Sequence, residues 1–129
     1  MIKGYRIEIP MLPPKECSPN ARVHWARKAR AAKAYRTAAN ACALAASQLA
    51  RPQWSKAELF ITIIISDKRH IRDTDNAIAS IKPAVDGCVD AGIIEDDNPE
   101  CLIYRTPVLY QVDREIAPMT ILEIKKVLE

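Results

Sequence analysis

The feature that most restricts the fold is a run of β-branched and apolar side chains at residues 57–65, with the sequence Ala-Glu-Leu-Phe-Ile-Thr-Ile-Ile-Ile. Branched side chains favour strands, and so apolar a run indicates a strand at the centre of a sheet. It is far too short to span a bilayer. We therefore expect a core built around a sheet that contains this segment.

An alanine-rich segment precedes this strand. Thirteen alanines fall between residues 21 and 50, and alanine has the highest helix propensity. We predict one long helix over residues 21–50, ended by Pro52, with Trp25 as a core anchor at its start or, alternatively, as a platform for an unpaired base. Helical spacing places the following residues on its sheet-facing side: Ala31, Ala34, Tyr35, Ala38, Cys42, Ala45 and Leu49.

Further strands and a second helix are predicted from alternating apolar residues, helix-capping residues, and glycine and proline. Alternating residues 5–9 predict a first strand. A second helix is expected from Asp75, as its cap, to Ala91, with Gly92 as its stop and Pro83 kinking it or breaking it in two. Its expected buried stripe is Ile78, Ile81, Val85 and Val89. Residues 101–112 and 117–127 are predicted strands that form a hairpin turning at 112–116.

The predicted order is β-α-β-α-β-β. This order is typical of an α/β or α+β fold, here a single domain over residues 1–129, with one mixed sheet covered by one long and one kinked helix. Its 129 residues are a usual length for one domain.

The chain starts directly with the first strand pattern and shows no apolar leader or membrane segment, so we expect a cytoplasmic protein. Its cysteines form no Cys-x-x-Cys pair, and only two histidines are present, which argues against a zinc site. Cys42 and Cys88 are expected to be small buried side chains.

Charge is distributed unevenly along the chain. Residues 1–56 carry 11 Lys and Arg against 2 Glu, whereas residues 57–129 carry 8 Lys and Arg against 14 Asp and Glu. Such a division suggests a grip for a polyanion beside a cation-binding site, and it is also compatible with charges that are merely solvated.

Carboxylates concentrate after the central strand. On a straight helix Asp75, Lys82 and Asp86 share one face. Asp73 precedes that helix, and Glu95, Asp96 and Asp97 follow in a loop. Two or three of these carboxylates around Mg²⁺, with a lysine alongside, would suit phosphodiester hydrolysis. Capping by Asp73 or Asp75 with an ordinary Lys82–Asp86 pair explains the spacing equally well.

The ordered motifs resemble the RusA family of Holliday-junction resolvases, most closely its phage and prophage versions. The resemblance covers about residues 5–112. It is carried by Arg72-Asp73-Thr74-Asp75-Asn76, Lys82, Asp86-Gly87, Ala91-Gly92-Ile93-Ile94, Asp96-Asp97 and the stretch Ser18-Pro19-Asn20-Ala21-Arg22-Val23-His24-Trp25.

This resemblance implies an endonuclease that uses Mg²⁺, with Mn²⁺ as a substitute, and cuts four-way DNA junctions as a homodimer in recombination and repair. It needs neither a membrane nor a nucleotide cofactor. The family's metal-binding and catalytic aspartates carry over to Asp73, Asp75 and Asp97, and its catalytic lysine to Lys82. Asp86 and Asp96 match further positions. The segment from Asn76 to Lys82 is three residues longer than in some members.

Basic residues are candidates for phosphate contacts. They are Lys68, Arg69 and Arg72 beside the carboxylates, and Arg27, Arg30, Lys33 and Arg36 on the long helix, where Arg22 and Lys28 are further candidates. Two other functions remain open from the sequence. One is a branched-DNA-binding protein without catalysis, and the other is a metal-dependent hydrolase of another phosphate ester.

Overall fold

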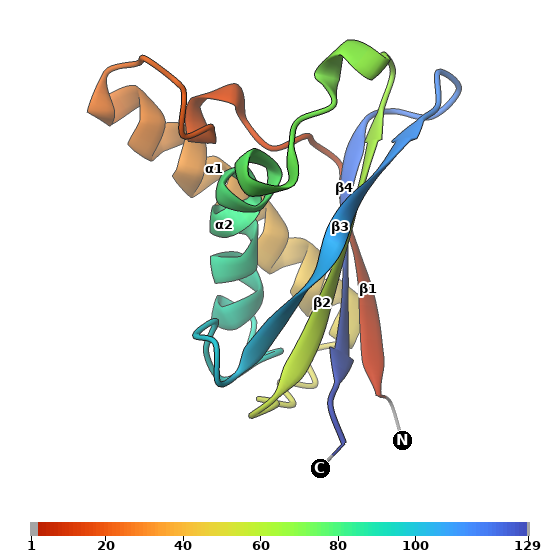
Figure 1. Cartoon of the computed structure of the whole chain (residues 1–129). Helices are drawn as coiled ribbons and strands as arrows, with labels where there is room; N and C mark the ends of the chain where they lie inside the picture. Colours follow the sequence, from red (N-terminus) through yellow and green to blue (C-terminus); the bar gives the residue numbers. More distant parts are fainter. Residues whose placement is uncertain (1–2, 129) are drawn as a thin grey trace.

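The computed structural model describes residues 3–128 and forms an α+β domain in which both long helices lie on one face of a four-stranded sheet (Figure 1). The chain order matches the predicted β-α-β-α-β-β. In sequence the elements are β1 (Gly4–Ile9), η1 (Lys15–Cys17), α1 (Trp25–Ser47), β2 (Ala57–Ile65), η2 (Lys68–His70), α2 (Thr74–Asp90), β3 (Leu102–Val112) and β4 (Met119–Lys126).

The sheet is mixed and has the strand order β1-β4-β2-β3. β2 is central, as predicted, and it pairs parallel with β3 and antiparallel with β4. β4 also pairs antiparallel with β1. The predicted β3–β4 hairpin is therefore wrong, because β4 inserts between β1 and β2.

Composition explains which strand takes the edge. β4 carries the buried run Thr120–Leu122 and buried Ile124, which suits a strand with neighbours on both sides. β3 instead has an exposed centre that includes Pro107. Proline lacks the N–H that a central strand needs for its ladder, so it is confined to edge strands. The proline therefore indicates that β3 is an edge strand, whichever strand it pairs with.

Helix α1 buries a face that matches the expected one only in part, with Tyr35 buried and Ala38 and Cys42 half-buried as predicted. Its buried residues are Tyr35, Ala39, Ala43 and Ser47, each one turn from the next, whereas Leu49 is 67% exposed. The helix begins only at Trp25, because the His24 imidazole caps it by accepting a hydrogen bond from the Ala26 N–H. Trp25 is 76% exposed, so its predicted role as a core anchor is wrong.

A buried polar chain connects α1, β4 and the loop after β1. The Thr120 hydroxyl donates to the Met11 carbonyl at 2.9 Å, so the Tyr35 hydroxyl donates to Thr120 Oγ1, at 2.7 Å. Burial raises the pKa of Tyr35 far above its usual value. These bonds satisfy buried polar atoms and hold the N-terminal loop beside the helices.

Helix α2 runs from Thr74 to Asp90 and continues through Pro83, so the expected break at this proline does not occur. Its cap is Asp73 rather than Asp75. The buried side differs partly from the expected stripe and consists of Asn76, Ala77, Ser80, Ile81, Ala84, Val85, Gly87 and Cys88. Gly92 follows the helix with a φ of +77°, consistent with its predicted role as a stop. Of the two cysteines expected to be buried, Cys88 is buried and Cys42 half-buried.

The two helices pack closely at Gly87. A Cβ atom at this position would lie 2.9 Å from the Ala39 Cβ and 2.9 Å from the Asn40 backbone nitrogen, too close for either contact. The Asn40 side-chain amide donates to the Gly87 carbonyl at 3.4 Å. Only glycine therefore permits this spacing of the helix backbones.

We predict that Gly87→Ala lowers the free energy of unfolding by about 1–3 kcal/mol, because overpacking the contact costs more than the helix propensity it gains. Urea denaturation would measure the change. The control Ala79→Gly, at an exposed site on the same helix, should cost about 1 kcal/mol through propensity alone. A stabilised Gly87→Ala protein would contradict the close approach.

Candidate functional site

The first group of predicted site residues lies at the N-terminus of α2. The Asp73 side chain caps the helix by accepting a hydrogen bond from the Asn76 N–H at 3.2 Å. Asp75 lies in the first turn, and both side chains are exposed. Carboxylates at a helix N-terminus are stabilised by the helix dipole. The capping explanation from the sequence is thus correct for Asp73, and it does not prevent Asp75 from binding a cation.

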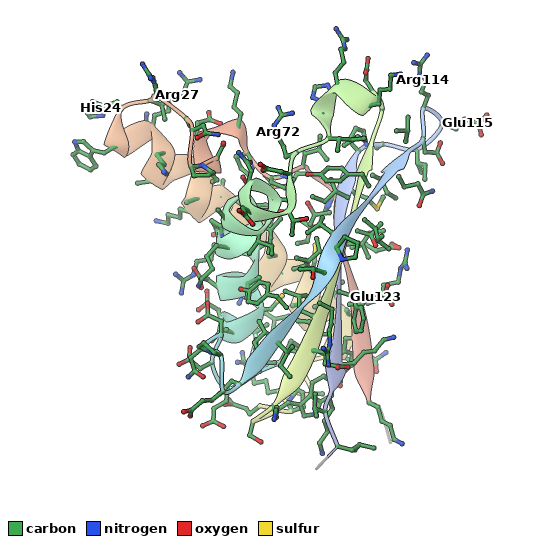
Figure 2. The ribbon with its side chains drawn as sticks, in the orientation of Figure 1. His24, Arg27, Arg72, Arg114, Glu115 and Glu123 are labelled. Atoms are coloured by element: carbon green, nitrogen blue, oxygen red, sulfur yellow. The ribbon has the colours of Figure 1, made fainter. Side chains whose placement is uncertain are left out.

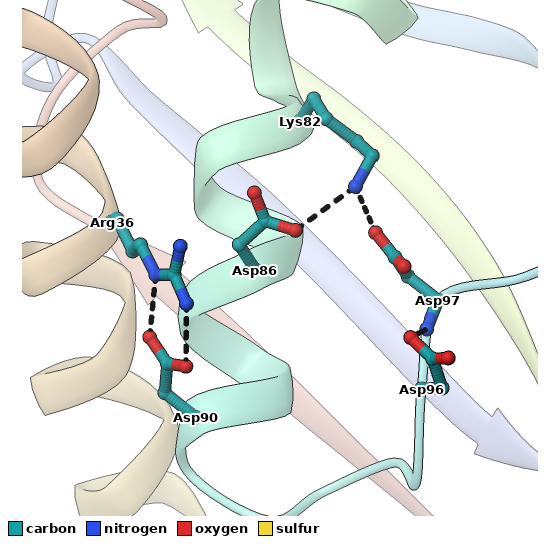
Figure 3. Close-up of polar contacts among 6 residues, drawn as sticks. All are labelled: Arg36, Lys82, Asp86, Asp90, Asp96 and Asp97. Carbon is teal, nitrogen blue, oxygen red and sulfur yellow. Dashed lines mark hydrogen bonds and ion pairs between the residues drawn. The ribbon is translucent and has the colours of Figure 1, made fainter. Parts of the chain in front are cut away.

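The second group lies further along α2 (Figure 3). The Lys82 ammonium donates to Asp86 Oδ1 at 2.9 Å and forms an ion pair with Asp97 from the loop before β3. The Asp97 N–H donates to Asp96 Oδ1 at 2.7 Å, which fixes the backbone of that loop. The structure therefore brings together Lys82, Asp86, Asp96 and Asp97.

Charge complementarity shifts the ionisation of this second group. The Lys82 ammonium, by hydrogen bonding and by its charge, lowers the pKa of Asp97, and partial burial opposes this only in part. Partial burial on its own would lower the pKa of Lys82, but the hydrogen bonds and charges of Asp97 and Asp86 outweigh it and raise that pKa. The Lys82 ammonium and the Asp97 carboxylate are therefore held in their charged forms at neutral pH.

The two groups of carboxylates are separated along α2. Asp75 and Lys82 are seven residues apart, which corresponds to about 10 Å along the helix axis. Oxygens that coordinate one Mg²⁺ lie about 2.1 Å from it. Within residues 3–128, no three His, Cys, Asp or Glu side chains converge closely enough to hold a metal ion. The donors suit Mg²⁺ chemically, but a single chain does not assemble Asp73, Asp75 and Asp97 around one ion.

Basic side chains gather at the end of the molecule where α2 begins. Figure 2 shows His24, Arg27, Arg72 and Arg114 at this end, together with η2, which carries Lys68 and Arg69. Arg27 pairs with Glu16 at 3.4 Å and Arg69 with Asp67 at 3.0 Å. These exposed pairs are weak and can exchange partners, so the surface remains suited to an anionic polymer.

The candidates on α1 divide into two sets. Arg36 forms a two-point ion pair with Asp90 of α2, at 2.7 and 2.8 Å (Figure 3). The Arg36 guanidinium lowers the pKa of Asp90. Arg36 thus connects the two helices, whereas Arg30 and Lys33 are exposed on α1. Arg36 was predicted to contact phosphate, but its guanidinium is engaged in the ion pair that connects α1 with α2.

Sequence reasoning missed a cleft of about 660 Å³ beside the N-terminus of α2. Its walls come from the N-terminal loop, α2, β2, β3 and the segment after η2. The polar side chains among its lining residues are Lys15, Ser18, Asn20, His70, Arg72, Asn76, Ser80 and Tyr110. Ser18, Arg72 and Asn76 belong to motifs quoted from the sequence, but nothing in their spacing indicated a shared cavity.

Comparison with known proteins gives no functional assignment. No family model matches this chain. A protein from Xylella fastidiosa (strain Temecula1), described only as uncharacterized, is 41% identical over 86 residues. The match covers 65% of this chain and 56% of the relative, so the chain spans little more than half the length of that protein. The function must be argued from the residues and their geometry.

None of the helices within residues 3–128 has the length and apolar character required to cross a bilayer.

We predict a pH-dependent contribution from Asp97. Because its folded-state pKa is lowered, its stabilising effect is present above the unfolded pKa of about 3.9 and is lost as pH falls through the folded value. Asp97→Asn should therefore reduce stability at pH 7 by about 1 kcal/mol or less, since Lys82 is half-exposed.

Denaturation of both proteins at pH 7 and at pH 3 would measure this effect. The difference between them should shrink at the lower pH. Glu100→Gln, at an exposed position in the same loop, serves as the control and should behave like wild type at both values. A constant difference for Asp97→Asn would contradict the ion pair.

Proposed function

We propose that this protein is a Mg²⁺-dependent endonuclease that resolves Holliday junctions, in the manner of the family its motifs resemble. The observation that carries the proposal is the position of Asp73 and Asp75 at the N-terminus of α2, shortly after Lys68 and Arg69 of η2 and next to Arg72. A phosphodiester held by those cations would lie next to carboxylates that suit Mg²⁺. We place this activity in the cytoplasm, where unpaired cysteines remain reduced.

The ion's contribution in such an enzyme is to activate water and stabilise charge on the phosphoryl oxygens. The chain's own residues supply the rest. Arg72 and Lys68 are placed to bind the DNA backbone, and the exposed Trp25, whose ring lies 5.5 Å from that of His24, offers a stacking surface. Lys82 keeps Asp97 ionised, and its charge offsets the charges of Asp86 and Asp97.

A homodimer accounts for the separation of the carboxylates. In a two-fold dimer with the axis perpendicular to α2, the two copies of this helix run antiparallel. The Asp75 end of one copy then lies near the Lys82 and Asp97 region of the other. The face that carries Asp75, Ala79 and Lys82 is exposed and available for this packing. The same symmetry presents two active sites to a four-way junction.

A branched-DNA-binding protein without catalysis is the second candidate. The observation that favours it is the ion pair of Lys82 with Asp97, which occupies one of the proposed metal ligands. A hydrolase of another phosphate ester has less support, because it gives no role to the basic end of the molecule.

We predict that the protein makes paired nicks in a synthetic four-way junction in the presence of Mg²⁺. It should make no nicks when EDTA replaces Mg²⁺, and none in a linear duplex of the same sequence. Asp75→Asn should reduce the rate at least about 100-fold, since a metal ligand is lost, while leaving the fold intact. Glu100→Gln should cleave as wild type does. Tight binding to the junction without cleavage in Mg²⁺ or Mn²⁺ would favour the second candidate.

We further predict complementation between two inactive variants. If Asp75 and Asp97 of different subunits act together, a heterodimer of Asp75→Asn with Asp97→Asn retains one intact site and nicks one strand. Two affinity tags would isolate the heterodimer, and each variant homodimer is the matched control. An inactive heterodimer would show that each site draws both residues from one chain.

A further inference from the structure

The cleft beside α2 combines an apolar interior with a flat aromatic ring. Ile63 and Ile65 of β2 contribute buried side chains, and Tyr110 of β3 is half-buried opposite Ile63 in the sheet register. The volume of about 660 Å³ falls within the range of cavities that bind small organic groups. Its interior therefore suits a planar, mostly apolar group.

The inner polar groups present one amide in a fixed orientation. Asn76 is only 8% exposed. Its Nδ2 donates to Ser18 Oγ at 3.1 Å, and its Oδ1 accepts from Ser80 Oγ at 3.2 Å. Each of these amide atoms keeps one further hydrogen-bonding position. An asparagine amide with a free donor and a free acceptor is the group that pairs with the edge of a nucleobase.

The charged lining residues have one sign. Lys15 and Arg72 are cations, His70 becomes one when protonated, and no carboxylate is among the residues that line the cleft within the described chain. The Tyr110 hydroxyl is a further polar group of the cleft. Partial burial raises its pKa, whereas a hydrogen bond from the Arg72 backbone N–H and the Arg72 charge act against the rise. A ligand with an anionic group at the rim fits this set of charges.

An apolar interior, one base-pairing amide and a cationic rim match a nucleotide. We propose that the cleft binds an unpaired nucleotide of a DNA strand, with its base next to Tyr110 and Asn76 and its phosphate at Lys15 and Arg72. This inference rests on the proposed function in taking DNA as the polymer. Arg72 and Asn76 of the cleft lining flank Asp73 and Asp75 in the sequence, so the bound nucleotide would lie near the carboxylates at the start of α2.

The cleft explains how such a protein would distinguish a branch from a duplex. Bases at a branch point or a bulge unstack at a smaller cost than bases within a paired helix. A cavity that binds an extruded base thus favours branched DNA over a fully paired duplex. The cationic rim alone would bind any duplex.

The experiment compares two duplexes in EDTA, one with a single extrahelical nucleotide and one with an abasic site at the same position. Both carry the same phosphates. Fluorescence anisotropy at fixed salt should show that wild type binds the first at least about fivefold more tightly, as expected for one stacked base. Tyr110→Ala should abolish this preference and keep the affinity for the abasic duplex.

Two further variants make the result specific to the cleft. Tyr104→Ala removes a half-buried tyrosine from the same strand, outside the cleft, and should retain the preference. Ser80→Leu fills the cavity and should lose it. Circular dichroism would verify that each variant is folded. If Ser80→Leu is not folded, Tyr110→Ala alone decides whether the cleft binds the extrahelical nucleotide.

The outcomes separate this inference from the proposed function. Equal affinity of wild type for the two duplexes overturns the nucleotide cleft and leaves the nuclease proposal standing. Absence of binding to any DNA overturns both. Binding of a free deoxynucleoside monophosphate with no preference between the duplexes overturns the DNA-strand assignment and makes the cleft a mononucleotide site.

Discussion

The contact of α1 with α2 at Gly87 determines how α2, the helix that carries Asp75, Lys82 and Asp86, is held in the fold. Because no Cβ fits between the helices there, their backbones touch, and Asn40 and the Arg36–Asp90 pair fix their rotation. Gly87 and Asp90 lie in the last turn of α2, so these contacts hold the C-terminal end of that helix against the middle of α1. The N-terminal carboxylates and the Lys82 group are kept apart by the length of α2 itself.

A second set of contacts holds the N-terminal loop against this helix. The Tyr35–Thr120–Met11 chain secures the start of the loop, and the Ser18–Asn76 hydrogen bond secures its later part. Buried polar bonds of this kind are costly to break, since each broken bond leaves an unpaired group without water. These bonds hold in place the loop that forms one wall of the cleft.

Local patterns in the sequence predicted most of the elements, because strand runs, alanine content and caps act over a few residues. The central strand at 57–65 and the stop at Gly92 are examples. The predicted hairpin failed because pairing of β4 depends on competition between distant strands. The buried face of α1 was predicted only in part, since a helix rich in alanine on all sides gives little periodic signal. The carboxylates were identified as residues, but their distances follow from the length of α2.

The place of β4 in the sheet has a consequence for how the chain acquires its structure. β4 follows the other three strands in sequence, yet it lies between β1 and β2 and pairs with both of them. Without β4, β1 has no neighbouring strand in this sheet. During synthesis β1 has no strand partner until more than a hundred further residues have emerged, so the sheet is completed only at the end. Such long-range pairing slows folding and exposes strand edges meanwhile. A ribosome-bound chain that ends before residue 119 would therefore rely on chaperones.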